Sequence, residues 1–216
     1  MSDSEDDSPQ LSREALTALQ EFYTQQAEKD KKLRCILEGK ERLLQRIQFD
    51  EDWQLSQFWY DDETAEYLSR EALKAAGPTG KIALISCPTL YKNLKSEAHN
   101  NQVTLFEFDK RFAIYGEDFI LYDYNTPLDI PCHFAGNFDV VVVDPPFLSE
   151  ECLTKTAVTV KFLAKHKIIL CTGANMEELA KKLLDVRKCE FEPHHKNNLA
   201  NEFYCYANYD IGIETK

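Results

Sequence analysis

The sequence lacks the long apolar run and the basic leader that direct a chain into or across a membrane. No apolar stretch approaches the roughly 18 residues that a membrane-spanning helix needs. The segment Met1–Asp7 is acidic, whereas a secretory or mitochondrial signal would be basic. These absences predict a protein without membrane association that stays in the cytosol or nucleus, and we expect a cytoplasmic location.

Cysteine and histidine patterns that hold a structural metal are also missing. The seven cysteines lie at least 16 residues apart, so the sequence contains no Cys-x-x-Cys pair. His194 and His195 are adjacent, and adjacent residues rarely bind one metal ion. We therefore expect reduced thiols that pack as small apolar side chains, and no metal site.

Basic charge is scarce. Lysine and arginine total 25 against 37 aspartates and glutamates, which leaves a net charge of −12. Proteins that hold nucleic acid usually present a basic surface to the phosphates, so nucleic acid is not the expected partner. The charge would attract a basic protein partner, although a role in solubility alone explains it equally well. We expect a monomer.

Composition divides the chain into three parts. Residues 1–10 read as a disordered acidic tail, and 11–50 carry apolar residues at helical spacing, which predicts an N-terminal helical extension. Within that extension, 29–48 is rich in Lys, Arg and Glu and suits a solvated surface helix or a partner-binding one. Residues 51–216 are predicted to form one α/β domain, beginning with the aromatic-rich segment 53–60.

From residue 81, apolar segments alternate with helical patterns. The predicted strands are 81–86, 103–108, 119–122, 138–143 and 167–171, closed by two more at 187–192 and 203–209. Asp61 or Asp62 and Ser149 are predicted helix caps. This order predicts a Rossmann-like, seven-stranded, doubly wound sheet with an antiparallel C-terminal hairpin. In such a sheet the ligand crevice lies beyond the carboxyl ends of the strands.

Carboxylates follow three of the first four predicted strands. Asp109 lies 23 residues after Ser86, the distance at which an acid can accept both hydroxyls of a ribose. Glu107, on the same face two residues earlier, is the alternative. Asp123 would lie beside an adenine ring, and Asp144 follows the most hydrophobic strand. Each acid alone is an ordinary loop residue, but three along one sheet edge indicate a site.

Asp144 is followed by Pro145, Pro146 and Phe147. Two prolines remove two backbone donors and stiffen the chain after a buried strand, so that carbonyls are free to point into a cleft. An amine that attacks a methyl group needs acceptors for its hydrogens, and the Asp144 carboxylate and the Pro145 carbonyl can supply them. Phe147 offers an apolar face to a planar base or a lysine head. Asp144→Ala should therefore reduce turnover far more than donor affinity.

Strand–Asp–Pro–Pro–Phe is similar to the (Asn/Asp)-Pro-Pro-(Tyr/Phe) motif of the class I S-adenosylmethionine-dependent amino-methyltransferases. Other segments resemble one branch of that family, the eukaryotic lysine methyltransferases that act on translation elongation factor 1-alpha. The similarity covers roughly residues 8–28 and 50–210, while 29–48 departs from it. The segments that carry it are Trp53–Tyr60, Phe106–Phe112, Asp144–Cys152 and Asn198–Phe203.

The resemblance implies S-adenosylmethionine as cofactor and a lysine of elongation factor 1-alpha, a basic protein, as substrate. It favours substrate contacts by Asn198, Asn201 and Glu202. The glycine-rich turn that wider methyltransferases carry after the first strand is absent, and Ser86, Cys87 and Pro88 stand in its place. Ser86 and Pro88 are therefore candidate cofactor residues, and the segment that ends in Trp59 and Tyr60 is expected to help cover the donor.

Two other functions fit the same residues. Methylation of adenine N6 suits the Asp-Pro-Pro-Phe corner equally well, because a flipped adenine presents a planar amine. The acidic charge and the lack of a separate target-recognition segment speak against it. A non-catalytic binding module that kept the fold is the third possibility. A thermal shift with S-adenosylmethionine would separate it from an enzyme.

Overall fold

The computed structural model describes residues 20–21, 23–24, 49–197 and 201–211. The chain divides into two units, Met1–Gln48 and Phe49–Lys216. In the first unit the four described residues are helical, and the Thr24 hydroxyl donates to the Gln20 carbonyl at 2.8 Å. The expected acidic tail 1–10 and the segment 29–48 lie outside the described residues. All that follows concerns the second unit.

The second unit is built on one seven-stranded sheet with the order β3-β2-β1-β4-β5-β7-β6. Strands β1 to β5 are parallel, β7 runs antiparallel to β5, and β6 runs antiparallel to β7. The predicted doubly wound sheet with a C-terminal hairpin is confirmed. The strands are β1 (Lys81–Ile85), β2 (Gln102–Glu107), β3 (Phe119–Leu121), β4 (Phe138–Val143), β5 (Ala164–Gly173), β6 (Arg187–Lys188) and β7 (Phe203–Ala207).

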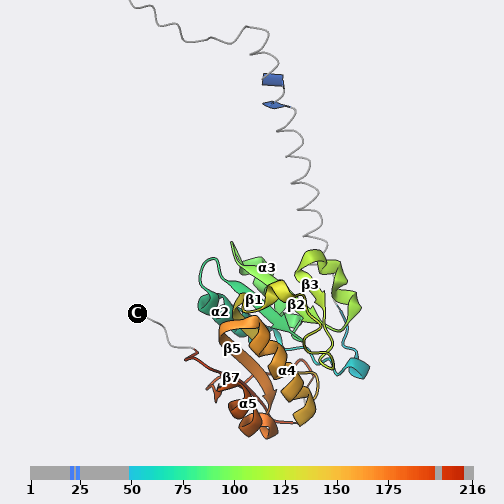
Figure 1. Ribbon diagram of the computed structural model, residues 1–216, viewed down its shortest axis with the longest axis vertical. Helices are drawn as coiled ribbons and strands as arrows, with labels where there is room; N and C mark the ends of the chain where they lie inside the picture. The colour runs from blue at the N-terminus through green and yellow to red at the C-terminus, as the bar shows by residue number, and fades with distance from the viewer. Residues whose placement is uncertain (1–19, 22, 25–48, 198–200, 212–216) are drawn as a thin grey trace, which may run out of the picture. The chain divides into compact units, whose positions relative to one another are not determined.

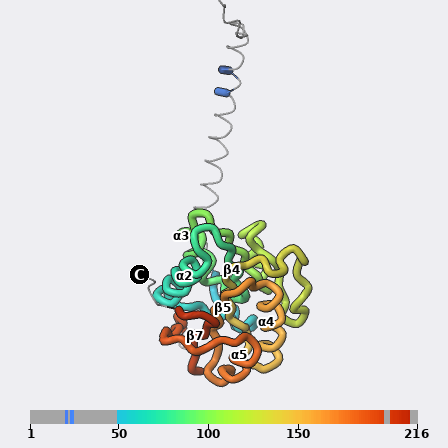
Figure 2. The backbone as a smooth tube through the Cα atoms, turned by 60° about the vertical axis from the view of Figure 1, so that its left-hand side comes forward, coloured from blue at the N-terminus to red at the C-terminus, as the bar shows by residue number. Residues whose placement is uncertain are grey.

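Helices cover both faces of the sheet. Figures 1 and 2 show α2 and α3 apart from α4 and α5, which pack on the opposite face. The α-helices are α2 (Asp62–Ala76), α3 (Thr89–Glu97), α4 (Glu150–Leu163) and α5 (Glu177–Leu184). Short 3-10 segments connect the larger elements: η1 (Trp53–Leu55), η2 (Lys110–Asp118), η3 (Cys132–Phe134) and η4 (Ala174–Met176). None of the helices in the described part of the chain has the length and apolar character that a bilayer crossing requires.

Two predicted caps start helices as expected. The Asp61 carboxylate accepts the Thr64 N–H at 2.8 Å and begins α2. The Ser149 hydroxyl accepts the Cys152 N–H at 3.2 Å and begins α4. Each cap satisfies a backbone donor that has no partner inside the helix, an effect of about 1 kcal/mol.

The core lies on both sides of β4. Val141 and Val143 belong to the cluster that α4 and α5 complete, while Val140 and Val142 are buried on the other face. Side chains of a strand alternate between faces, so four consecutive valines are all buried only in a central strand covered twice. The sheet therefore presents its strand ends, rather than its faces, to ligands.

The first of the two predicted C-terminal strands, 187–192, is shorter than expected and ends at Lys188. After Cys189 the chain leaves the sheet, and Phe191 stacks on Tyr67 of α2 with ring centroids 3.8 Å apart. The His194 N–H donates to the Thr64 hydroxyl at 2.9 Å. These contacts hold the segment against α2. We call the described residues 189–197 and 201–202 the C-terminal loop.

Candidate active site

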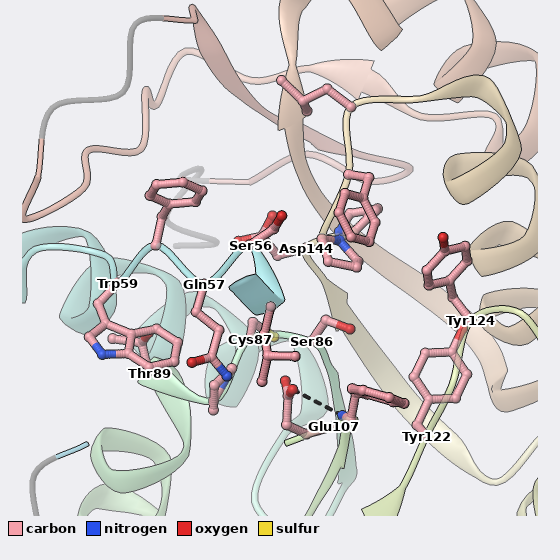
Figure 3. A pocket seen from close by; sticks show the side chains of 18 of the residues that line it. Ser56, Gln57, Trp59, Ser86, Cys87, Thr89, Glu107, Tyr122, Tyr124 and Asp144 are labelled. Carbon is pink, nitrogen blue, oxygen red and sulfur yellow. Dashed lines mark hydrogen bonds between the residues drawn. The ribbon is translucent and has the colours of Figure 1, made fainter. Parts of the chain in front are cut away.

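A cavity of about 580 Å³ lies beyond the carboxyl ends of β1, β2 and β4. The strand order reverses between β1 and β4, and ligands of doubly wound sheets bind where it does so. Figure 3 shows side chains from separate elements converging on this space. Eleven of the predicted site residues line the cavity: Trp59, Tyr60, Ser86, Pro88, Glu107, Asp123, Asp144, Pro145, Pro146, Phe147 and Asn201.

Three predicted site residues are not among those that line the cavity. Asp109 is buried outside the cavity lining, and Asn198 lies outside the described residues. Glu202 is exposed, also outside the lining. Its carboxylate accepts the Tyr204 hydroxyl at 3.1 Å, and its backbone carbonyl accepts the Ala174 N–H at 2.9 Å.

The turn after β1 is made without glycine. Ser86 adopts the left-handed conformation, with φ at +55°, and its N–H donates to the Phe106 carbonyl at 2.9 Å. A non-glycine residue in this conformation costs about 1 kcal/mol, which the surrounding strands β1 and β2 must offset. Pro88 is the residue immediately before α3. Ser86 thus takes a backbone conformation that favours glycine.

Glu107 is the acid on the cavity wall at the end of β2. Its Oε1 accepts the N–H groups of Phe108 and Asp109 at 2.9 and 3.0 Å. Within the described chain, Oε2 accepts no hydrogen bond. Burial raises the pKa of Glu107 to about 7, and the two backbone donors only partly oppose this. A buried carboxylate with one unengaged oxygen is suited to accept ligand hydroxyls.

Asp109, which spacing favoured for that role, serves the protein instead. Its Oδ2 accepts Gln57 Nε2 at 2.9 Å and Arg111 Nε at 2.8 Å. Its Oδ1 accepts the Arg111 N–H at 2.9 Å. Burial alone would raise the pKa of Asp109, but the Arg111 and Gln57 hydrogen bonds lower it below its usual value. The structure thus places Glu107, the alternative, on the cavity wall and Asp109 outside the lining.

The Asp109 network also secures the segment that covers one side of the cavity. Gln57, itself a lining residue, accepts the Asp52 N–H and an Arg111 Nη2–H through Oε1, both at 3.0 Å. Trp59 donates through Nε1 to the Phe49 carbonyl at 2.8 Å. Residues 49–61, which we call the cover segment, are therefore tied by side-chain hydrogen bonds to Asp109 and to Arg111 of η2.

Asp123 lines the cavity beyond β3. Its Oδ1 accepts the Asn125 N–H at 2.8 Å, an arrangement that keeps the loop turned and leaves Oδ2 without a hydrogen bond among the described residues. Tyr124, the next residue, places its ring 5.8 Å from the Phe147 ring, at an angle of 61°. Phe147 remains 41% exposed. Two aromatic rings from different strand ends thus flank the side of the cavity that reaches solvent.

Asp144 begins the proline corner at the end of β4. Its N–H donates to the Ile85 carbonyl at 3.0 Å, and its Oδ2 accepts the Tyr60 hydroxyl at 2.7 Å. Burial raises the pKa of Asp144 to about 7; the Tyr60 hydrogen bond opposes the rise, and the nearby Glu107 carboxylate adds to it. The carboxyl is therefore close to half ionised near neutral pH.

His195 of the C-terminal loop is another lining residue. Its ring lies between those of Tyr60 and Phe203, at centroid distances of 5.0 and 4.9 Å. Burial lowers the pKa of His195 to about 4, so the imidazole is neutral at physiological pH. The cover segment and the C-terminal loop pair here: Lys196 N–H donates to the Trp59 carbonyl, and Asp61 N–H to the His194 carbonyl.

Some lining residues were not predicted from the sequence. Phe108, which is 53% exposed, directly follows Glu107, so the rule that sites follow strand ends could have included it. Gln57, Tyr124 and His195 carry no such signal. Their positions depend on contacts between segments far apart in the chain.

The sheet order, the cavity at its switch point and the Asp-Pro-Pro-Phe corner on the cavity wall define the class of S-adenosylmethionine-dependent methyltransferases. Residues 51–211 match the family described as "Probable N6-adenine methyltransferase", and the chain belongs to this family.

Its curated relatives carry a different substrate in their names. It is 53% identical to EEF1A lysine methyltransferase 1 of Homo sapiens, over 99% of both chains. It is 39% identical to protein-lysine N-methyltransferase EFM5 of Saccharomyces cerevisiae, over 93% of this chain and 92% of that one. Among solved structures, a putative RNA methyltransferase of Pyrococcus horikoshii shares the fold, with a TM-score of 0.51, 14% identity and coverage of 83% of this chain and 98% of that one.

Proposed function

We propose that this protein is an S-adenosylmethionine-dependent protein-lysine N-methyltransferase that modifies a lysine of translation elongation factor 1-alpha. The observation that carries the proposal is the 53% identity to the human lysine methyltransferase, which extends over 99% of both chains. The acidic charge of −12 suits a basic protein substrate. A cytoplasmic location and a monomeric state belong to the same proposal.

The described residues suit the proposed cofactor. The cavity of about 580 Å³ is within the range of small-molecule sites. Glu107 would accept the ribose hydroxyls through its unengaged oxygen, the Ser86–Pro88 turn would receive the methionine part, and Asp123 with Phe108 would border the adenine. The cofactor, when bound, supplies a methyl group on positively charged sulfur.

The residues of the proline corner would receive the amine. Oδ1 of Asp144 is the carboxylate oxygen that Tyr60 leaves available, and the Pro145 carbonyl is the second acceptor for N–H groups. Two acceptors orient the nitrogen so that its lone pair points away from them, towards the methyl group. Phe147 and Tyr124 would enclose the aliphatic part of a lysine side chain.

A lysine must lose a proton before it can attack, because its unperturbed pKa is about 10.4. An ionised carboxylate would stabilise the ammonium form and raise that pKa, whereas enclosure by aromatic rings lowers it. The pKa of about 7 at Asp144 reduces this conflict, since the carboxyl is not fully charged near neutral pH. We infer that Asp144 contributes through positioning more than through charge.

Methylation of adenine N6 is the second candidate, because the description of the family favours it. An Asp-Pro-Pro-Phe corner would bind a flipped adenine as readily as a lysine amine. The net charge of −12 weighs against this alternative, and so do the names of the relatives, which are lysine methyltransferases.

The substrate class can be tested with radiolabelled S-adenosylmethionine in a cell extract. After reaction with the purified protein, half of the sample is digested with nuclease and half with protease. We expect label that survives nuclease and is lost to protease, and we expect labelling of purified elongation factor 1-alpha but not of the same protein with its lysines blocked by reductive alkylation. Asp144→Ala serves as the inactive control. Label lost only to nuclease would establish the adenine activity instead.

A further inference from the structure

The Tyr60 hydroxyl donates a hydrogen bond to Asp144 from a buried position in the cavity wall. The hydroxyl lies 2.7 Å from Oδ2, and the Tyr60 side chain is 2% exposed. Among the residues that the structure describes, Tyr60 is the one side chain that donates a hydrogen bond to this carboxylate. A tyrosine in the cavity wall, 84 residues away in sequence, therefore governs how Asp144 is oriented.

The backbone around Tyr60 is held from both sides. It forms an isolated antiparallel bridge with His195, and the neighbouring hydrogen bonds from Lys196 to Trp59 and from Asp61 to His194 measure 2.8 and 3.0 Å. Asp61, the next residue, caps α2. The phenol is therefore supported by a helix and by the C-terminal loop, so its hydroxyl can act as a fixed reference point rather than a mobile donor.

We propose that Tyr60 is a positioning residue for methyl transfer: its hydroxyl occupies Oδ2 of Asp144 and thereby presents Oδ1 to the substrate amine. The inference rests on the proposed amine methylation, and it assigns Tyr60 a role other than the cofactor contact that the sequence suggested. A carboxylate with both oxygens unengaged can rotate and accept the amine in several orientations. One oxygen held by Tyr60 leaves a single acceptor in a defined direction.

Loss of the hydroxyl also changes when Asp144 is ionised. The Tyr60 hydrogen bond lowers the pKa of Asp144 against the effect of burial, so its removal raises that pKa above 7. The titratable groups that face Asp144 are Tyr60 itself, Glu107 at the end of β2, Cys87 after β1 and Cys152 in α4. Glu107 repels the ionised form and acts in the same direction as burial.

The test is Tyr60→Phe, which keeps the ring against His195 and removes only the hydroxyl. We expect kcat to fall on the order of tenfold to a hundredfold, the Kd of S-adenosylmethionine to stay within about threefold, and the acidic limb of the kcat–pH profile to move to higher pH. Tyr91→Phe is the matched control, because the Tyr91 hydroxyl donates to Asp118 Oδ2 at the same 2.7 Å but outside the cavity. That variant should keep the wild-type profile.

A double-mutant cycle with Asp144→Asn decides whether Tyr60 acts through Asp144. If it does, adding Tyr60→Phe to Asp144→Asn lowers kcat far less than adding it to the wild type. Independent, multiplicative losses would overturn the proposal, as would a wild-type kcat and pH profile in Tyr60→Phe. A wild-type protein that leaves elongation factor 1-alpha unlabelled would instead defeat the proposed function, and this outcome is recognised before any variant is measured.

Discussion

At the scale of single residues, the two carboxyl groups Glu107 and Asp144 share one cavity and one physical situation. Burial raises the pKa of each to about 7, and each keeps one carboxylate oxygen unengaged by the described residues. They follow different strands, β2 and β4, on either side of β1. A ligand with hydroxyls at one end and a reacting group at the other would occupy both.

Glu107→Gln should weaken the binding of S-adenosylmethionine on the order of tenfold to a hundredfold, because a neutral amide accepts ribose hydroxyls less strongly than a carboxylate does. Isothermal titration calorimetry measures the change. Asp109→Asn is the comparison, since Asp109 is engaged with Arg111 and Gln57 outside the cavity lining. It should weaken binding less than Glu107→Gln does, because it reaches the cavity only through Gln57 of the cover segment. A larger loss in Asp109→Asn than in Glu107→Gln would restore the order that sequence spacing suggested.

At the scale of elements, the cover segment and the C-terminal loop form one wall of the cavity although they come from opposite ends of the domain. Glu51 connects them. Its Oε1 accepts the Trp59 N–H at 2.8 Å, and its Oε2 accepts Trp53 Nε1 at 3.1 Å and Asn197 Nδ2 at 2.6 Å. Burial would raise the pKa of Glu51, but these hydrogen bonds lower it below its usual value.

Glu51→Ala should therefore loosen both segments. We expect the Lys196 and Asp61 amide protons, which close the pairing between them, to exchange with solvent about tenfold faster. Hydrogen exchange followed by NMR measures this directly. Asp50→Ala removes the same charge from an exposed neighbouring position and controls for electrostatics alone. Equal exchange in Glu51→Ala and wild type would mean that the backbone pairing and the aromatic packing hold the two segments together without Glu51.

At the scale of the whole molecule, the cavity makes the stability of the ligand-free protein depend on pH. The folded pKa values of Glu107 and Asp144 lie above those of an unfolded chain, which are about 4. The folded state therefore binds more protons than the unfolded state, and stability is lost as pH rises from about 4 through 7. His195 acts in the opposite sense below its unfolded pKa of about 6.5, because its folded pKa is about 4.

The double variant Glu107→Gln/Asp144→Asn isolates the contribution of the two acids. The Tm of the variant minus that of the wild type should be larger at pH 7.5 than at pH 5.5, by about 4 °C or more. In the wild type, each acid's contribution to the free energy of unfolding falls by on the order of 2 kcal/mol over that range. Differential scanning calorimetry at the two pH values gives the comparison. The histidines are common to both proteins, so their titration cancels in the difference. A constant Tm difference would show that neither carboxyl has a raised pKa in the folded state.

Much of this molecule was predictable because the responsible interactions are local or periodic. The run Val140–Val143 is apolar throughout, as expected of a central parallel strand covered on both faces, and Asp61 and Ser149 cap helices through their own next turn. The strand order then brings the strand ends to one edge. The placement of Asp144–Phe147 on the cavity wall follows from that topology alone.

The sequence by itself determined the fold class and the position of the Asp-Pro-Pro-Phe corner at the end of β4, because hydrophobic periodicity and proline stereochemistry act over a few residues. Only the tertiary structure decided which acid after β2 faces the cavity, because Gln57 and Arg111 draw Asp109 away from it. It also paired Tyr60 with Asp144 and brought His195 to the cavity wall. Such contacts join segments many residues apart, and their geometry depends on how the whole chain packs.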